Sequence, residues 1–475
     1  MRDLHFILVL ASFAFSLVTA GHAVLYKRDA RAALGWLALC LLVPWVGGAL
    51  YWIFGINRIR THAQDLHRRG RWKYLKDKNL DAVKNTDLKV SVLESFEPLH
   101  RLSTAVTQRP LLTGNQVRLL QDGEEAYPAM LEAIGAAREW VYLSTYIFDS
   151  DETGRQFVAA LSQAVARGVR VRVLVDAFGA QYSFPQVSRL LKKAKVPFSK
   201  FLPFSLSLDR FHPNLRNHRK MLLADNRIAF TGGMNIGDRH LVQKLPRKRR
   251  ISDLHFALTG PITQELQNVF LEDWFFSSGE SIAPATPDDH STGEVLARVV
   301  SSGPNEDFEK LSWILLGALS AAREKVKIIT PYFVPDRVIM AALNAAALRG
   351  IDVEIILPQK NNLPFVGWAS RALLWEMLQK GVKFYYQPPP FAHTKLMVVD
   401  GYYGLIGSSN WDARSFRLNF ELDVETYGAD FAGDLENYFQ TVQSRSRPVT
   451  LADLRRDSFF SRFRNDFFNL FSPYL

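Results

Sequence analysis

The sequence predicts an α/β protein of two tandem α/β/α halves with pseudo-twofold symmetry, preceded by a two-helix transmembrane hairpin. Three observations predict this fold. Two long uncharged stretches open the chain, a strand–helix–strand pattern then occurs twice, and each copy of that pattern leads to the same short motif. We expect four segments: the transmembrane hairpin at 1–57, a basic juxtamembrane linker at 58–110, the first half at 111–295 and the second half at 296–475.

Composition sets the outer limits on function. The 475 residues are 48% hydrophobic, enough for a large core, and the formal net charge is +11. Because Cys40 is the only cysteine, an intramolecular disulfide and a cysteine-rich metal site are excluded. The positive charge favours anionic partners, and alone it does not distinguish nucleic acid from an anionic membrane surface.

The two N-terminal stretches, residues 4–26 and 32–56, contain no Asp, Glu, Lys or Arg. Each is long enough to cross a hydrocarbon core of about 30 Å as a helix, and a short charged turn joins them. Pro44 and Gly47-Gly48 are expected to bend the second span or let it pack closely. A signal peptide cleaved near residues 18–20 is the alternative, but the length of the apolar run and the second span favour retained helices.

The segment after the second span is strongly basic. It carries eight Lys or Arg residues between positions 58 and 78, whereas the turn between the spans carries three. The positive-inside rule therefore predicts a multi-pass membrane protein whose later residues lie in the cytoplasm. The same segment can lie against anionic headgroups or be a solvated linker.

The region after the linker repeats one pattern. Residues 136–148 and 321–333 both begin Ala-Ala-Arg-Glu and end in a β-rich stretch, and Asp151 and Asp336 follow at equivalent places. An alanine-rich helical stretch and a second β-rich run come next in both copies. This order is typical of βαβ units and favours a mostly parallel sheet covered by helices.

Each copy leads to the motif His-x-Lys, four residues, Asp, six residues and Gly-x-x-Asn. A single His near a Lys usually belongs to an ordinary strand, but two copies with every spacing kept favour a shared function. Alternation on a strand places the His and Lys on one face, and Asp225-Asn226 and Asp400-Gly401 are suited to tight hairpin turns. The motif positions are His218, Lys220, Asp225 and Asn235 in the first half, and His393, Lys395, Asp400, Ser408 and Asn410 in the second.

Paired histidines and lysines without a carboxylate cluster suit phosphoryl transfer without a metal or other cofactor. A neutral imidazole can attack phosphorus, while a protonated one gives its proton to the leaving alkoxide. Lys220, Lys395, Asn235 and Asn410 would stabilise the phosphoryl oxygens, since the Gly-Gly and Gly-Ser pairs allow close backbone approach. Glu421 and Asp253 are candidates to fix the imidazole tautomers. A zinc site is disfavoured because the His and Asp spacing does not fit one and Lys is not a normal ligand.

The duplicated motif resembles the phospholipase D superfamily, and within it the chain is most similar to bacterial cardiolipin synthases over nearly its whole length. The similarity includes residues 34–55, 216–220, 231–238 and the last four residues. It implies an inner-membrane enzyme that joins two phosphatidylglycerols into cardiolipin, releases glycerol, and acts on lipids rather than nucleic acid. It also implies His218 as the nucleophile that carries the phosphatidyl group and His393 as the acid and base. The family often has Trp-Arg before the aspartate matched by Asp253, where this chain has Ile251-Ser252.

Several alternatives remain open at this point. The acceptor could be water, as in a phospholipase, or another alcohol, and phosphatidylethanolamine could replace one phosphatidylglycerol. A nuclease or a non-catalytic lipid-binding protein are the other candidates. Two surface features are equally ambiguous: the basic residues between Lys244 and Arg250 could hold headgroups or be solvated, and the Phe-rich stretch 459–471 could lie at a membrane interface or dock into the core.

Overall fold

The computed structural model describes residues 2–27, 30–55, 93, 95–203, 215–244, 246, 250–285, 291–304 and 309–472. The basic segment at 58–78 and the basic residues at 247–249, both singled out in the sequence, lie outside the described residues. The helices before residue 56 belong to one compact unit, and every element from α6 onwards belongs to another.

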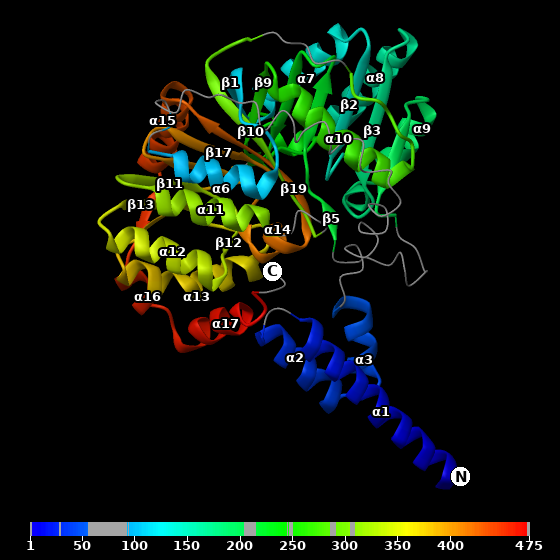
Figure 1. Cartoon of the computed structure of the whole chain (residues 1–475), viewed down its shortest axis with the longest axis vertical. Helices are drawn as coiled ribbons and strands as arrows, with labels where there is room; N and C mark the ends of the chain where they lie inside the picture. Colours follow the sequence, from blue (N-terminus) through cyan, green and yellow to red (C-terminus); the bar gives the residue numbers. More distant parts are fainter. Residues whose placement is uncertain are drawn as a thin grey trace. The chain divides into compact units, whose positions relative to one another are not determined.

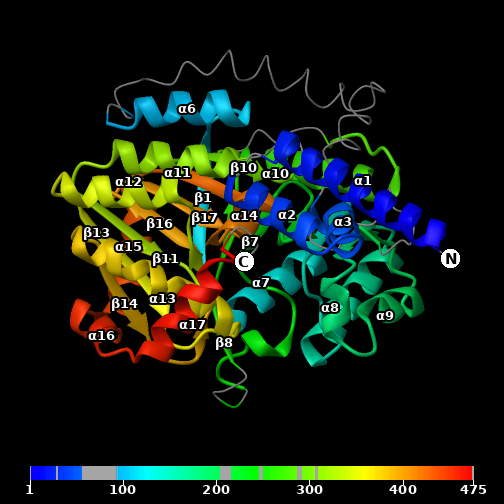
Figure 2. The same cartoon turned by 90° about the horizontal axis from the view of Figure 1, so that it is seen from below.

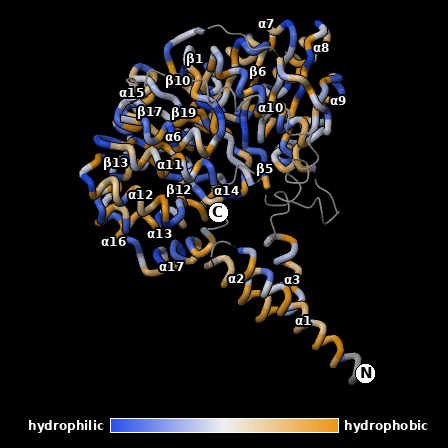
Figure 3. Tube along the Cα trace, in the orientation of Figure 1, coloured by the Kyte–Doolittle hydropathy of each residue, from blue (hydrophilic) through white to orange (hydrophobic). Residues whose placement is uncertain are grey.

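The N-terminal unit is a helical hairpin of α1 (Arg2–Tyr26), α2 (Ala30–Leu42), α3 (Val46–Leu50) and a single π-helical turn, η1 (Tyr51–Gly55). The first predicted span is confirmed as one helix, and His5–Tyr26 is long and apolar enough to cross a membrane. The second predicted span is not continuous, because Pro44, which has no N–H, separates α2 from α3. A Cβ at Gly48 would overlap the Phe15 ring, so close packing depends on this glycine. Figure 3 shows that hydrophobic residues dominate these helices.

The larger unit is organised around one long mixed sheet (Figures 1 and 2). Its first half comprises β1 (Leu112–Gln121), α7 (Asp122–Ala136), β2 (Trp140–Thr145), α8 (Glu152–Ala166), β3 (Arg170–Asp176), η3 (Gly179–Tyr182), α9 (Val187–Lys193), β4 (Phe198–Phe201), β5 (Arg216–Asn217), β6 (Met221–Ala224), β7 (Ile228–Gly232), η5 (Asp238–His240), β8 (Ile251–Ser252), β9 (Leu254–Thr259) and α10 (Ile262–Ser278).

The second half repeats this order. It comprises β10 (Val295–Ser302), α11 (Lys310–Ala321), β11 (Lys325–Ile329), β12 (Phe333–Val334), α12 (Arg337–Leu348), β13 (Asp352–Pro358), α13 (Pro364–Gln379), β14 (Lys383–Gln387), β15 (Phe391–Ala392), β16 (Leu396–Val399), β17 (Tyr403–Gly407), β18 (Trp411–Asp412), α14 (Ala413–Arg417), β19 (Asn419–Tyr427), α15 (Ala429–Ser444), β20 (Arg447–Val449), α16 (Leu451–Arg455) and α17 (Phe459–Asn469).

The sheet shows directly how the halves are related. Its strand order is β20-β14-β13-β11-β16-β17-β19-β10-β1-β9-β7-β6-β2-β3-β4. Apart from β20 at one edge, each half contributes the same series of strands in mirrored order. The equivalent strands β1 and β10 meet in the middle and pair antiparallel. Equivalent strands that pair antiparallel are related by a twofold rotation, which establishes the predicted pseudo-symmetry.

The prediction of a mostly parallel sheet is wrong for the centre of the sheet. The βαβ units do form parallel pairs, β2 with β3 and β11 with β13, as their crossover helices require. The motif hairpins add antiparallel pairs, β6 with β7 and β16 with β17. The predicted tight turns are present: Asp225, Asn226, Asp400 and Gly401 all have positive φ, as two-residue turns of the primed type require. Antiparallel pairing therefore follows from the same residues that the sequence marked as turns.

Helices cover both faces of the sheet. On β17, Gly404 faces Leu435 of α15, while its neighbours Tyr403 and Leu405 join the core formed with α11. Because successive strand residues point to opposite faces, α11 and α15 lie on opposite sides. The segment 58–110, which we expected to be a linker, contains a packed helix near its end, since α6 (Glu97–Thr107) buries Leu99 in this core. The helix has a strong apolar face, which the mixed composition of that segment concealed.

Candidate active site

The two histidine motifs are brought together by short strands that cross between the halves. β5, just before His218, pairs in parallel with the start of β19, and β15, just before His393, pairs in parallel with β8. The backbone N–H of His218 donates to the Phe420 carbonyl, and that of His393 to the Ser252 carbonyl, each at 2.8 Å. We had expected the two His-x-Lys segments to lie within strands. They lie instead just beyond the short strands β5 and β15.

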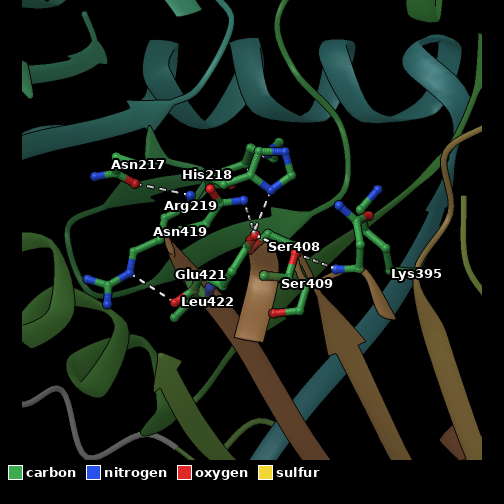
Figure 4. A network of polar contacts seen from close by, with 12 residues as sticks. Asn217, His218, Arg219, Lys395, Ser408, Ser409, Asn419, Glu421 and Leu422 are labelled. Atoms are coloured by element: carbon green, nitrogen blue, oxygen red, sulfur yellow. Dashed lines mark hydrogen bonds and ion pairs between the residues drawn. The ribbon is translucent and has the colours of Figure 1, made fainter. Parts of the chain in front are cut away.

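Each imidazole contacts a carboxylate from the opposite half. His218 Nδ1 lies 2.9 Å from Glu421 Oε2, and His393 Nδ1 lies 2.8 Å from Asp253 Oδ2 (Figure 4 shows the first pair). The ring centroids of the two histidines are 6.5 Å apart and the rings are nearly perpendicular. Because a carboxylate engages Nδ1 of each ring, Nε2 is the nitrogen left for chemistry at a phosphorus atom.

The departure from the family at Ile251-Ser252 does not displace Asp253. These two residues form β8, and they contact the second motif through backbone hydrogen bonds. Asp253 itself is fully buried and accepts a hydrogen bond from the Leu254 N–H at 2.8 Å. Its own backbone N–H donates to Asp122 Oδ1 at 2.8 Å, so backbone contacts on both sides hold Asp253 in place.

The two carboxylates differ in their surroundings. Glu421 also accepts hydrogen bonds from Ser408 Oγ at 2.6 Å, Ser415 Oγ at 2.9 Å and Asn419 Nδ2 at 3.0 Å. Burial would raise the pKa of Glu421, but His218, Lys220 and Ser408 outweigh this and bring it to about 2. In Figure 4 the donors converge on this one carboxylate.

Asp253 has no equivalent of Ser408. Gly233 holds that position in the first half, and a Cβ there would lie 2.5 Å from Asp253 Oδ1, so a serine has no room. Burial raises the pKa of Asp253 to about 6, although Lys395 and His240 oppose the shift. The two equivalent carboxylates of the pseudo-symmetric site thus have pKa values shifted in opposite directions, downward for Glu421 and upward for Asp253.

The motif lysines are buried beside the histidines. Lys220 Nζ donates to the His218 carbonyl at 2.6 Å, and Lys395 Nζ donates to the His393 carbonyl. Burial lowers the pKa of Lys220 to about 7 and that of Lys395 to about 8, while Glu421 and Asp253 oppose these shifts.

Burial also lowers the pKa of both imidazoles. Glu421 opposes this shift for His218, whereas Lys395 and Lys220 lower the pKa of His393 further. Both rings are therefore poised as neutral imidazoles near neutral pH.

The two motif aspartates bind backbone N–H groups rather than an imidazole. Asp225 lies at the far end of β6 and accepts hydrogen bonds from the backbone N–H groups of residues 138–140. Asp400 does the same for residues 323–325. Asn235 Oδ1 accepts from the Ile147 N–H at 3.0 Å, whereas Asn410 Oδ1 is buried without a hydrogen-bond partner among the described residues.

We predict that Asp225→Ala destabilises the protein by about 3 kcal/mol, because three backbone donors lose a charged acceptor and alanine tolerates positive φ poorly. Thermal or urea unfolding of the purified variant measures this. Asp225→Asn is the matched control, since asparagine keeps an acceptor and adopts the left-handed conformation readily; it should lose less than half as much. A loss below about 1 kcal/mol in Asp225→Ala would show that these turn hydrogen bonds contribute little to stability.

Sequence reasoning missed residues that support the site. Tyr146 and Tyr332 contact the His218 and His393 rings at centroid distances of 5.2 and 6.2 Å, and their equivalent places in the repeat were a usable signal. Arg219, in the middle of the first motif, is buried, pairs with Asp273 at 2.7 Å and donates to the Glu421 carbonyl at 3.0 Å. Arg219 occupies the x position of His-x-Lys, and the second copy has Thr394 there, so the repeat did not indicate that Arg219 supports the site.

A mixed sheet in which two repeated halves each contribute a His-x-Lys motif to one centre is the fold of phospholipase D-like proteins. The family described as "Cardiolipin synthase, PLD-like domain" matches residues 130–274 and 315–443, and "Phospholipase_D-nuclease N-terminal" matches residues 14–55. Cardiolipin synthase A of Pseudomonas aeruginosa is 34% identical over 440 residues, covering 92% of this chain and 89% of the relative. Cardiolipin synthase A of a Pseudomonas fluorescens strain is 35% identical over 447 residues, covering 92% and 90%. The chain therefore belongs to the cardiolipin synthase family.

A solved structure supports the fold independently. The crystal structure of phosphatidylserine synthase from Haemophilus influenzae superposes with a TM-score of 0.63 at 15% sequence identity, covering 79% of this chain and all of that one. At this identity the similarity concerns the fold alone.

Proposed function

We propose that this protein is a cardiolipin synthase that transfers a phosphatidyl group from one phosphatidylglycerol to another and releases glycerol. The observation that carries the proposal is the pair of buried imidazole–carboxylate contacts, each made between the two halves, with a buried lysine beside each histidine. Membership of the cardiolipin synthase family supports the choice of substrates over other phosphodiesters.

The reaction needs one nucleophile and one acid. The negative charge of the bound phosphodiester offsets Lys395 and Lys220, which lower the pKa of His393 in the free site, and so favours the protonated form of His393. Nε2 of His218 attacks the phosphorus of the first phosphatidylglycerol, the P–O bond to the glycerol headgroup breaks, and protonated His393 gives its proton to the departing glycerol. Neutral His393 then takes the proton from a primary hydroxyl of the second phosphatidylglycerol. That oxygen attacks phosphorus, the P–N bond breaks, and cardiolipin and free His218 result.

Electrostatics support His218 as the nucleophile. An imidazole phosphorylated on Nε2 that keeps its Nδ1 proton carries a positive charge for the lifetime of the intermediate. The carboxylate with a pKa of about 2, Glu421, contacts His218, so it can balance that charge at any physiological pH. Lys220 and Lys395 neutralise the phosphoryl oxygens, which gain charge in both transition states.

Product analysis tests the proposed function. Purified protein in vesicles of headgroup-labelled phosphatidylglycerol should release labelled glycerol and form cardiolipin in equal amounts. Phosphatidic acid without cardiolipin would instead establish a phospholipase, and adding phosphatidylethanolamine reveals whether it serves as a second donor or acceptor. Cleavage of nucleic acid by the same preparation would support the nuclease alternative.

We further propose that the catalytic part lies on the cytoplasmic side of the bacterial inner membrane. The apolar α1 helix supports membrane association, and the excess of basic residues after residue 57 supports the orientation. Protease accessibility in inverted and right-side-out vesicles distinguishes the two orientations.

The lowered pKa values of the lysines predict an alkaline limb in the pH profile. A lysine is charged below its pKa, so Lys220 and Lys395 lose their charge as pH rises through about 7 and 8. We expect kcat/KM for phosphatidylglycerol to fall between about pH 7 and 9, mainly through KM, because a bound phosphodiester restores the charged form. Lys220→Arg stays charged and should move this limb to higher pH; a profile that is level across this range in the wild type would contradict the prediction.

A further inference from the structure

The C-terminal helix α17 divides its surface into three sectors. Ser461, Arg464, Asn465 and Phe468 face the protein and are partly or fully buried. Arg462 and Asp466 form a charged edge. The third sector spans about 100° at 3.6 residues per turn and contains the exposed side chains Phe459, Phe460, Phe463 and Phe467. Leu470 and Phe471, in the turn that follows the helix, are also exposed. The sequence left open whether these Phe residues dock or face outward; only Phe468 of this helix joins the core.

The exposed sector is a preformed, contiguous surface. The rings of Phe459, Phe463, Phe467 and Phe471 follow one another at centroid distances of 6.5, 6.5 and 5.4 Å. Phe463 is 63% exposed and Phe460 is 80% exposed. Isolated exposed apolar residues are common on proteins, but a continuous row of aromatic rings marks an interaction surface.

The helix is held firmly on α13, beside which it lies in Figures 1 and 2. Arg371 of α13 binds the Asp457 carboxylate with two hydrogen bonds of 2.6 and 2.9 Å just before α17 begins. Further along, Phe468 packs on Trp368 of α13 at a ring distance of 5.0 Å, and the Arg464 guanidinium lies 4.5 Å from the same ring. The aromatic row therefore has a fixed direction relative to the rest of this unit.

A short series of contacts connects this surface with the second histidine. Phe468 contacts Phe365, in the first turn of α13. The segment just before α13 is tied to the site, because the Tyr332 hydroxyl donates to Asn362 Oδ1 at 2.8 Å and the Tyr332 ring contacts His393. Leu363, next in the chain, is 39% exposed.

The first half also exposes apolar side chains beside its tyrosine and histidine, Tyr146 and His218. The Tyr146 ring contacts both His218 and Tyr182, and Tyr182 and nearby Phe184 are 57% and 88% exposed. Exposed apolar side chains thus lie a few contacts away from each histidine, and we take them as the rim of the site. Such a rim suits a ligand whose phosphodiester enters the site while its acyl chains stay in an apolar phase.

We infer that the Phe face of α17 inserts into the surface of an anionic phospholipid bilayer and holds the mouth of the histidine site against the membrane. Arg455, Arg456 and Arg462, on and just before this helix, are exposed and can pair with lipid phosphates. Phe on one side and Arg beside it is the composition of interfacial helices. The inference rests on the proposed function only for the identity of the lipid. An N-terminal membrane anchor would raise the effective concentration of bilayer for any second contact made by the same chain.

The single cysteine makes this testable in the full-length protein. Cys40→Ser removes the only thiol, and Phe463→Cys then carries a nitroxide label. The matched control is Leu348→Cys at the end of α12, since Leu348 is 67% exposed and precedes β13, at the end of the sheet opposite the histidines. In vesicles of phosphatidylglycerol and phosphatidylcholine, we expect the label at 463 to collide with dissolved oxygen more than with a water-soluble nickel chelate, and the label at 348 to show the reverse.

The outcomes are distinct. A label at 463 as accessible to nickel as the one at 348 would overturn the inference, and protection from both reagents together with spin–spin broadening would identify a second copy of the chain as the occupant instead. The accessibility measurements do not require catalysis. Insertion of the label at 463 without cardiolipin formation would therefore contradict the proposed function and leave the membrane inference intact. As a kinetic arm, Phe460→Ser/Phe463→Ser/Phe467→Ser should lower kcat/KM on vesicles about tenfold but keep activity on monomeric short-chain phosphatidylglycerol within about twofold, and Leu348→Ser should change neither.

Discussion

His218→Ala is expected to lower kcat for phosphatidyl transfer by at least about 10⁴-fold, and His393→Ala by about 10³-fold. The difference follows from the proposed roles, since no other group can form the phosphohistidine, whereas solvent can supply a proton slowly. Both side chains are 8% exposed, so thermal unfolding should be checked to separate a catalytic defect from misfolding. Cardiolipin formation from labelled phosphatidylglycerol measures the effect.

A substrate with a better leaving group separates the two roles. A phosphatidyl ester of p-nitrophenol loses its leaving group without protonation, so His393→Ala should regain release of nitrophenol on this substrate. His218→Ala should remain inactive, because attack at phosphorus still requires the imidazole. Rescue of His218→Ala with continued inactivity of His393→Ala would assign the roles the other way round.

Much of the fold was predictable from local signals. The repeat of Ala-Ala-Arg-Glu, an aspartate and a β-rich run identified the βαβ units, and Asp151 and Asp336 do cap the helices that follow them. The turn residues identified both hairpins. The central antiparallel strands were not predictable in the same way, because β1, β9, β10 and β19 pair over long sequence separations and no turn chemistry marks their partners.

The site was predictable as a set of residue types and less so as a set of contacts. Repetition singled out His218, Lys220, His393 and Lys395, and the acidic residues Glu421 and Asp253 were named as their partners from charge alone. Spacing could not show that each carboxylate crosses to the opposite half, which depends on the pairing of β5 with β19 and of β15 with β8. Nor could it show that Asp225 and Asp400, although parts of the motif, hold backbone turns.

The sequence also could not predict how the surroundings of the two histidines differ. The duplicated motif suggests two equivalent histidines, yet a nucleophile and an acid need different surroundings. The difference lies in small substitutions between the copies, with Ser408 where the first half has Gly233 and Ser415 and Asn419 beside Glu421. Their effect appears only when the side chains are placed around one carboxylate.

Glu421→Gln is expected to lower kcat about 10³-fold at every pH at which the enzyme is active, because His218 loses the anion that balances its charge. The amide also offers one acceptor oxygen where the carboxylate offers two, so it competes poorly for the donors that surround this position. Glutamine has almost the same volume, so the protein should still fold. Asp253→Asn should behave differently: below about pH 6 the aspartate is already protonated and the substitution should cost little, whereas the cost should grow as pH rises through the pKa of the carboxyl.

The ratio of wild-type to variant kcat, measured across the pH range for both substitutions, tests this difference. A constant ratio for Glu421→Gln and a rising ratio for Asp253→Asn would show that the two dyads, although built from equivalent residues, are tuned to different tasks. Parallel ratios for both variants would mean that the serine and asparagine donors around Glu421 serve packing alone. In that case the choice between the histidines would have to come from the lipid, since the first phosphatidylglycerol would then bind with its leaving glycerol toward one imidazole only.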